Sequence, residues 1–307
     1  MTLAIQATKE WDRIVLLKER SLSVTDEEIA TYSTKYLKPG KKGELRRIQV
    51  RGLMDLEETI GTNYGHVSAW GVGHGKFLMS VLAFTARHDT QRPLLFVPAK
   101  LKHQTERELV EQGRTWNIRK DIKVMSWEIL SRQSGFEQLV RYAPDGIVGD
   151  EIHAIKNPQS SRFKNLWRYA KHMREAVETQ VWIAGLSGTL TNRSIKEMTH
   201  ILNLCLLDKS PLPRTYRETE AWALAVDEKI DDYQRPEPGV LRTWMTADEQ
   251  EEGHIGARKA LRRRMSNTSG FSATAAGSLG TSLNVFEWGT GPSRESIKPY
   301  TNRVTTW

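Results

Sequence analysis

Residues 71–77 read Gly-Val-Gly-His-Gly-Lys-Phe and stand between an apolar run at 66–70 and a second apolar segment that begins at Leu78. A short apolar run, a cluster of glycines and a longer apolar segment are typical of a strand that turns tightly into a helix. Glycines at such a turn let backbone N–H groups curl around a phosphate, and the helix adds the positive end of its dipole. The stretch therefore indicates a phosphate-binding loop, and a glycine-rich turn without a ligand is the alternative.

From about residue 61 to residue 206, short apolar runs alternate with longer amphipathic segments. The apolar runs predict strands at 66–70, 94–97, 122–125, 146–149 and 181–186. Strands that alternate with helices predict an α/β fold with a mainly parallel sheet flanked by helices. In such a sheet the functional loops lie at the carboxyl ends of the strands.

The clearest predicted helix spans 161–177, because its apolar residues recur with the period of an α-helix. These residues are Phe163, Leu166, Trp167, Ala170, Met173 and Val177. We expect this face, aromatic side chains included, to pack into the core.

The flanking regions differ from this central part. We predict a helical and basic N-terminal extension at 1–43, the main domain at 44–210 and an irregular extension at 211–307. Ser23 to Glu28 resembles a capped helix start, and seven Lys and Arg residues lie between Lys35 and Arg51. Four prolines between 211 and 238 interrupt the last region, which holds one short predicted helix near 219–226.

Composition narrows the function classes. The chain has 307 residues, with 45 Lys and Arg against 37 Asp and Glu, a net charge of +8 that favours a polyanionic partner. A mildly basic enzyme surface would give the same balance. The single cysteine, Cys205, excludes a disulfide framework and a multi-cysteine zinc site. The longest apolar runs fall far short of the ~20 residues of a membrane span, so we expect no membrane partner. The lone cysteine makes a reducing, intracellular setting the default, and we expect a cytoplasmic protein, of an infected host cell if it is phage-encoded.

A second candidate site is the sequence Gly-Ile-Val-Gly-Asp-Glu-Ile-His at 146–153. Here an apolar strand ends in two adjacent carboxylates. Beside a triphosphate, Asp150 would hold Mg²⁺ and Glu151 would act as general base towards the attacking water. His153 could relay the state of the γ-phosphate. The alternative is that the two carboxylates only cap a helix.

Two further clusters are less specific. Residues 186–192 read Leu-Ser-Gly-Thr-Leu-Thr-Asn at another strand end, where Ser187, Gly188 and Thr189 could sense the acidic loop or form an ordinary Ser/Thr turn. Basic residues also gather between Arg258 and Arg264, including Arg262 and Arg263. They could form a solvated face or contact phosphates.

In order and spacing, these segments resemble the motifs of a superfamily 2 helicase core. The chain looks like the first RecA-like lobe, a P-loop domain, of a DEAD/DEAH-type, Swi/Snf-related helicase in the form found in phages. The resemblance covers about residues 44–210. It matches 71–77 to motif I, 95–101 to motif Ia, 124–130 to the Ser-Tyr-x-x-Leu segment near motif Ib, 150–153 to motif II, 187–189 to motif III and 45–49 to the adenine-reading segment.

The resemblance implies ATP and Mg²⁺ as cofactors and nucleic acid, with DNA favoured, as the partner. It assigns adenine recognition to Gln49, phosphate binding to the motif I residues, metal binding to Asp150, coupling to His153 and 187–189, and backbone contacts to Pro98 and Lys100. The motif I residues are Gly73, His74, Gly75, Lys76 and Phe77, of which Lys76 would reach the β- and γ-phosphates.

Two departures from the family pattern affect the expected activity. Phe77 stands where motif I has Thr or Ser, whose hydroxyl binds Mg²⁺. No second-lobe motif is found, so we expect slow ATP hydrolysis unless a second lobe acts in trans. One rival function is a nucleotide- or DNA-binding module without turnover. The other is a P-loop kinase, which the Asp-Glu-x-His and Ser-Gly-Thr loops disfavour.

Overall fold

A parallel sheet of six strands organises the computed structural model, which describes residues 4–19, 23–190, 194–227, 230 and 235–274. The strand order is β3-β2-β4-β5-β1-β6, and every neighbouring pair is parallel. The strands are β1 (Val67–Ala69), β2 (Pro93–Val97), β3 (Lys123–Ser126), β4 (Gly146–Asp150), β5 (Trp182–Ser187) and β6 (Phe271–Ala273). All six carboxyl ends therefore meet at one edge of the sheet.

The five predicted strands are confirmed, each within one residue at either end. The sixth strand, β6, was not predicted. It has three residues, and it pairs with β1 through Val67 opposite Phe271 and Ala69 opposite Ala273. A strand this short carries no readable alternation of apolar and polar residues, so the sequence around Gly270 looked irregular.

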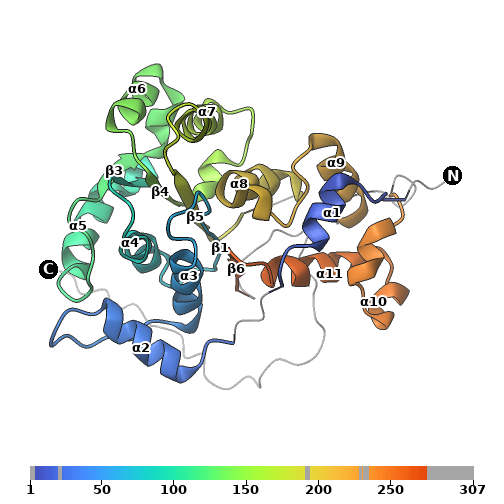
Figure 1. Ribbon diagram of the computed structural model, residues 1–307, viewed down its shortest axis with the longest axis horizontal. Helices are drawn as coiled ribbons and strands as arrows, with labels where there is room; N and C mark the ends of the chain where they lie inside the picture. The colour runs from blue at the N-terminus through green and yellow to red at the C-terminus, as the bar shows by residue number, and fades with distance from the viewer. Residues whose placement is uncertain (1–3, 20–22, 191–193, 228–229, 231–234, 275–307) are drawn as a thin grey trace, which may run out of the picture.

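Helices cover both faces of the sheet (Figure 1). One face carries α3 (Arg47–Glu57), α4 (Lys76–Ala86) and α5 (Lys102–Gln112), and the other carries α6 (Gln133–Tyr142), α7 (Ser161–Glu175) and α8 (Lys196–Leu206). The strands β2, β4 and β5 contribute to both cores; in β2, Leu95 and Val97 pack with the first group while Leu94 and Phe96 pack with the second. The α/β fold with helices on both faces of a parallel sheet is thus the predicted one.

The remaining elements are short or lie outside these two layers. They are α1 (Lys9–Val15), α2 (Asp26–Tyr36), α9 (Tyr216–Val226), α10 (Ala247–Glu251), α11 (His254–Ser266), η1 (Ala99–Leu101), η2 (Trp127–Ser131), η3 (Ile152–Ile155), η4 (Leu207–Lys209) and η6 (Gly239–Trp244). Helix α2 starts where the sequence predicts, because Thr25 and Glu28 form a reciprocal capping box. Helix α9 starts three residues before the predicted 219–226.

Helix α7 corrects one expectation. It ends at Glu175, and Leu166, Ala170 and Met173 are buried as predicted. The prediction that the whole apolar stripe is core is wrong for Trp167 and Val177, which are 42% and 48% exposed. The stripe is wider than the surface that α6 and η2 cover, so its margin faces solvent.

The chain after residue 210 returns to the first part of the molecule. Trp222 of α9 and Trp244 of η6 pack around Trp11 of α1, with ring centroids 6.2 and 4.7 Å from the Trp11 ring. Helix α11 packs beside β6, next to β1 (Figure 1). The domain boundaries after residues 43 and 210 stay predictions. Among the described residues, no helix is long and apolar enough to cross a membrane.

Candidate nucleotide site

Three loops predicted to carry chemistry leave neighbouring strands at the carboxyl edge. The order β4-β5-β1 puts the end of β5 between the acidic loop after β4 and the glycine loop after β1. Ser187 pairs in register with Ala69 of β1, and the preceding Leu186 pairs with Asp150 of β4. The topology therefore brings together three loops that are spread along the chain from residue 71 to residue 189.

The glycine loop turns through two left-handed residues, Gly73 at φ +85° and Gly75 at φ +72°. Residues with side chains rarely adopt these angles, so both glycines are needed for the loop to close. The Lys76 ammonium donates to the carbonyls of Trp70, at 3.1 Å, and Gly71, at 3.3 Å. The lysine therefore lies over its own loop, and His74 beside it is half-buried.

Phe77 packs its half-buried ring against the core shared by α3, α4 and the sheet. Ser80 lies one turn further along α4, and its buried hydroxyl donates to the Phe77 carbonyl at 2.7 Å. The Ser80 hydroxyl is thus engaged by a backbone carbonyl of its own helix, and it does not replace the hydroxyl that Phe77 lacks.

The N-terminal end of α3 holds the glycine loop. Gln49 is buried; its Oε1 accepts from the Arg46 backbone amide at 2.8 Å and its Nε2 donates to the Gly75 carbonyl at 3.0 Å. The Arg46 guanidinium donates to the Gly73 carbonyl. The amide of Gln49 is engaged by the loop, so adenine recognition would require these bonds to exchange. The contact of Arg46 was not predicted, and its position three residues before Gln49 in a capping arrangement is the only sequence signal for it.

The acidic loop combines two carboxylates in different electrostatic states. Burial raises the pKa of Asp150 to about 6; the neighbouring Glu151 adds to this rise, and Lys76 opposes it. The hydrogen bond from His153 is the main cause that lowers the pKa of Glu151, although burial opposes it. Glu151 also has a left-handed backbone, at φ +53°.

The third loop touches the second. Ser187 Oγ lies 3.0 Å from His153 Nδ1 and donates to Glu151 Oε2 at 3.3 Å, and His153 Nδ1 lies 3.1 Å from the same carboxylate oxygen. The Thr189 amide donates to Ser187 Oγ at 3.1 Å. A Cβ at Gly188 would lie 3.6 Å from Lys76 Nζ, so this loop also adjoins the glycine loop. Thr191 and Asn192 lie outside the described residues.

The predicted nucleic-acid residues fall in two places. Pro98 and Lys100 follow β2 at the carboxyl edge, and Lys100 is exposed. Arg262 and Arg263 lie on α11; Arg262 is half-buried, and Arg263 pairs with Glu249 at 2.5 Å and donates to the Trp244 carbonyl.

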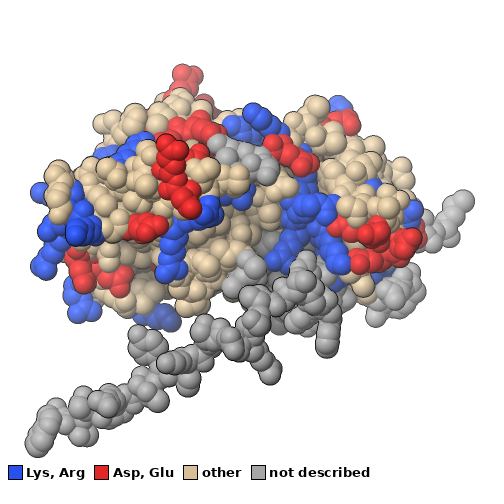
Figure 2. Space-filling view, turned by 90° about the horizontal axis from the view of Figure 1, so that it is seen from below, with Lys and Arg blue, Asp and Glu red and all other residues tan. Residues whose placement is uncertain are grey.

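The first and last arginines of the α11 basic cluster are buried and hold neighbouring segments of the chain. Arg258 and Arg264 are buried, and they donate to the carbonyls of Val226 and Ile14 respectively. Of the two alternatives left open for the cluster, a solvated face and phosphate contacts, neither applies to these two buried residues. On the face drawn in Figure 2, Lys and Arg side chains form separate patches with Asp and Glu between them.

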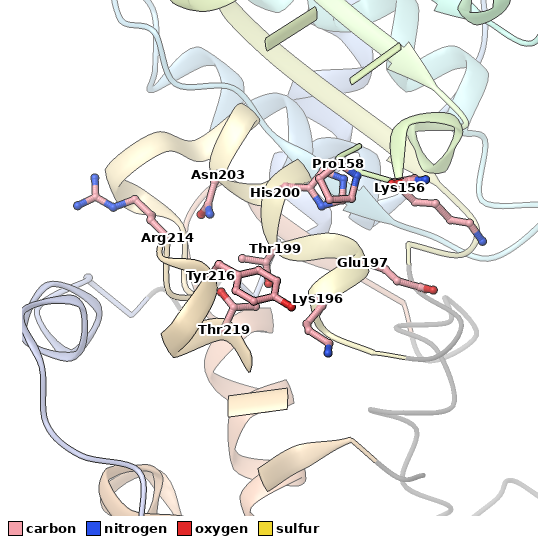
Figure 3. Close-up of a pocket in the computed structure, with 11 residues that line it drawn as sticks. Lys156, Pro158, Lys196, Glu197, Thr199, His200, Asn203, Arg214, Tyr216 and Thr219 are labelled. Carbon is pink, nitrogen blue, oxygen red and sulfur yellow. The ribbon is translucent and has the colours of Figure 1, made fainter. Parts of the chain in front are cut away.

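A cavity of about 420 Å³ lies between the segment after η3, helix α8 and helix α9 (Figure 3). Tyr216, Thr199 and Thr219 line its middle, and the rim carries Lys156, Lys196, Arg214 and Glu197. His200, also in its wall, lies 2.8 Å from the Ile155 carbonyl at the end of η3. The rim is mixed in charge, and the lining contains none of the residues predicted to bind nucleotide.

Comparisons with known proteins give a fold likeness only. No protein-family model and no curated protein matches the chain. Among solved structures, the chain resembles the Sulfolobus solfataricus SWI2/SNF2 ATPase core in complex with dsDNA, with a TM-score of 0.47 and 17% sequence identity. The match covers 78% of this chain and 46% of that one, so this chain spans about half of its length. At this level of similarity the match assigns no role to any residue.

Proposed function

We propose that this chain is a motor lobe of a superfamily 2 helicase or translocase, which binds ATP and Mg²⁺ and hydrolyses ATP in response to nucleic acid. The observation that carries the proposal is the meeting of Lys76, the pair Asp150 and Glu151, and Ser187 at one edge of the parallel sheet. A cation on a glycine loop beside two carboxylates suits a nucleotide triphosphate with its metal.

The residues of this edge fit such a ligand. The glycine loop and the start of α4 offer backbone N–H groups to phosphate oxygens, and Lys76 would exchange its two carbonyl partners for the β- and γ-phosphates. Asp150 would hold Mg²⁺, which when bound neutralises charge between the β- and γ-phosphates. A cation beside Asp150 would offset the burial that raises its pKa, so the carboxylate would ionise as the metal binds.

Glu151 suits the role of general base. The hydrogen bond from His153 lowers the pKa of its carboxyl group, and His153 and Ser187 orient the carboxylate through Oε2. In this role it would accept a proton from the attacking water. The same two partners would relay the state of the phosphates to the loop after β5.

We propose DNA as the nucleic acid, bound through its backbone by residues 98–101 and by Arg262 and Arg263 where they are accessible. Contacts of this kind give little sequence preference and a steep dependence on salt. A second lobe supplied in trans would complete the catalytic site, because an arginine from it is worth ~10³–10⁵ in rate in related phosphoryl transfer.

A second function is favoured by one observation. Phe77 offers no hydroxyl to Mg²⁺, and Ser80 does not replace it, so the chain could bind nucleotide without turning it over. Measurement of ATP hydrolysis with and without duplex DNA separates the two functions, with Glu151→Gln as the control. If the chain binds nucleotide but hydrolyses ATP no faster than the Glu151→Gln variant, the binding module is favoured. Absence of nucleotide binding by calorimetry would reject both.

A further inference from the structure

The segment that follows β3 joins two of the loops at the carboxyl edge. Residues 126–130, which resemble the Ser-Tyr-x-x-Leu segment, form the end of β3 and most of η2. Because the sheet order is β3-β2-β4, a side chain from η2 has to cross the end of β2 to reach β4. Trp127 does so.

Trp127 is 1% exposed, and its indole stacks on Phe96 of β2 with ring centroids 4.8 Å apart and an interplanar angle of 17°. Its Nε1 donates to the backbone carbonyl of Asp150 at 2.7 Å. A Cβ on Gly149 would come within 2.6 Å of the indole, so only glycine leaves room for the ring there. Trp127 therefore fixes the peptide that links the metal-binding candidate to the general-base candidate.

Glu128, the next residue, holds the loop after β2. Pro98 directly precedes η1 and provides no side-chain cap, which leaves the first amides of the turn in need of acceptors. The amide of Ala99 donates to Glu128 Oε2 at 2.9 Å. Glu128 therefore acts as the missing cap of the loop that carries Pro98 and Lys100.

The turn that carries both side chains is itself anchored. Asn165 of α7 donates to the Leu130 carbonyl at 2.8 Å, and Arg162 donates to Ser131 Oγ at 3.0 Å. One anchored turn thus holds the loop at 98–101 through Glu128 and the acidic loop through Trp127. A shift of either loop would strain its own hydrogen bond to this turn, and a movement of the turn would then strain the bond to the other loop.

We propose that Trp127 and Glu128 are positioning residues that couple nucleic-acid contact at 98–101 to the carboxylates of Asp150 and Glu151. The inference rests on the proposed function, since it requires that the chain bind both nucleotide and DNA. In this scheme neither side chain touches either ligand. Nucleic acid that displaces the Ala99 peptide moves Glu128 and the indole beside it, and the Asp150 carbonyl follows.

The test is the thermodynamic coupling between the two ligands. Calorimetry gives the dissociation constant of a non-hydrolysable ATP analogue with Mg²⁺, without DNA and with a saturating short DNA duplex, on the whole chain. We expect a ratio of roughly 5–150 between the two constants for the unaltered protein, the usual range of allosteric coupling. Trp127→Phe keeps an aromatic ring but loses the N–H donor, and it should bring the ratio close to 1.

Glu128→Ala should have the same effect. Glu128 is exposed, so this variant spares the core and keeps the test open if Trp127→Phe folds poorly. Glu128→Gln keeps an oxygen acceptor for the Ala99 amide and should retain the ratio. The double variant should lose no more than either single one, because the two residues act in one chain of contacts. Trp167→Phe and Glu137→Ala, at exposed positions elsewhere, serve as matched controls.

Three outcomes count against the inference. A ratio that stays unchanged in Trp127→Phe and Glu128→Ala, with only the unfolding temperature lowered, would show that the two residues are merely structural. A ratio of 1 in the unaltered protein, with both ligands bound, would reject the coupling and leave the proposed function standing. If the unaltered protein binds no nucleotide, the proposed function fails and the inference fails with it.

Discussion

The glycine loop and the basic cluster of α11 look alike in sequence, since both place Lys or Arg where a polyanion could bind, yet the structure treats them in opposite ways. Lys76 lies at the carboxyl edge of the sheet and donates to the carbonyls of Trp70 and Gly71, at the start of its own loop. Arg264 is 4% exposed, donates to the carbonyls of Ile14 and Leu17 and pairs with Glu19 at 2.6 Å. Positive charge in the sequence therefore predicts a binding surface only when the fold leaves that charge exposed.

The largest expected effect is the loss of stability when the buried Arg264 is replaced. Arg264→Ala removes the donor to the buried carbonyl of Ile14 and to the partly buried carbonyl of Leu17, and a buried acceptor that loses its donor costs about 1–3 kcal/mol. We expect the free energy of unfolding to fall by about 2–4 kcal/mol in urea titrations. Arg242→Ala is the control, because Arg242 pairs with Glu237 on the surface and such pairs contribute about 0–1 kcal/mol. Equal losses in the two variants would contradict the structural role of Arg264.

Replacement of Lys76 should have the reverse effect, a loss of ATP affinity with little change in stability. Lys76→Ala removes the one ammonium on the glycine loop, and charge-assisted hydrogen bonds contribute about 1.5–3 kcal/mol, so ATP affinity should fall on the order of 10–100-fold. Stability should change little, since Lys76 is only half-buried. Calorimetry and thermal unfolding measure the two quantities. Lys171→Ala, at an exposed position on α7, should change neither. A Lys76→Ala protein that still binds ATP normally would mean that the loop is not a nucleotide site.

The contrast also explains how far the sequence could be interpreted. Strand ends, glycines and adjacent carboxylates are local signals, so the five strands and the three loops could be predicted. The hydrogen bonds of Gln49 to Gly75 and of Trp127 to Asp150 join residues 26 and 23 positions apart, and they depend on how α3 and η2 pack. The burial of Arg264 depends on α1 and the residues just after it, since its carbonyl partners Ile14 and Leu17 lie 250 and 247 positions away. No local pattern carries that information.

A third prediction concerns pH and the carboxylate of Glu10, which two arginines contact. Glu10 of α1 accepts hydrogen bonds from Arg13 and Arg214, and these bonds lower its pKa to about 2 even though burial opposes the shift. The unfolded chain therefore binds a proton at higher pH than the folded chain does. Glu10 stabilises the fold above its unfolded value of 4.5, and this stabilisation is lost as the pH falls from there towards 2.

We expect the loss to be about 1–3 kcal/mol after allowance for solvent screening. Urea titrations at a series of pH values between 3 and 6 measure it. Glu10→Gln should be less stable at pH 6 and should lack this part of the pH dependence. An identical slope in the two proteins would place the titrating group elsewhere.

The smallest effect concerns Phe77, the residue at which the glycine loop departs from the phosphate-loop pattern. Its half-buried ring packs on the core, so Phe77→Thr should lower the free energy of unfolding by about 1–2 kcal/mol. The new hydroxyl stands where a phosphate loop binds its metal, so the gain in ATP affinity on addition of Mg²⁺ should increase by a factor of a few, roughly 1 kcal/mol. Phe77→Val loses similar volume without gaining a hydroxyl, and it separates packing from metal binding. If Phe77→Thr and Phe77→Val show the same Mg²⁺ dependence, the hydroxyl does not reach the metal, and the loop binds phosphate through Lys76 and backbone amides alone.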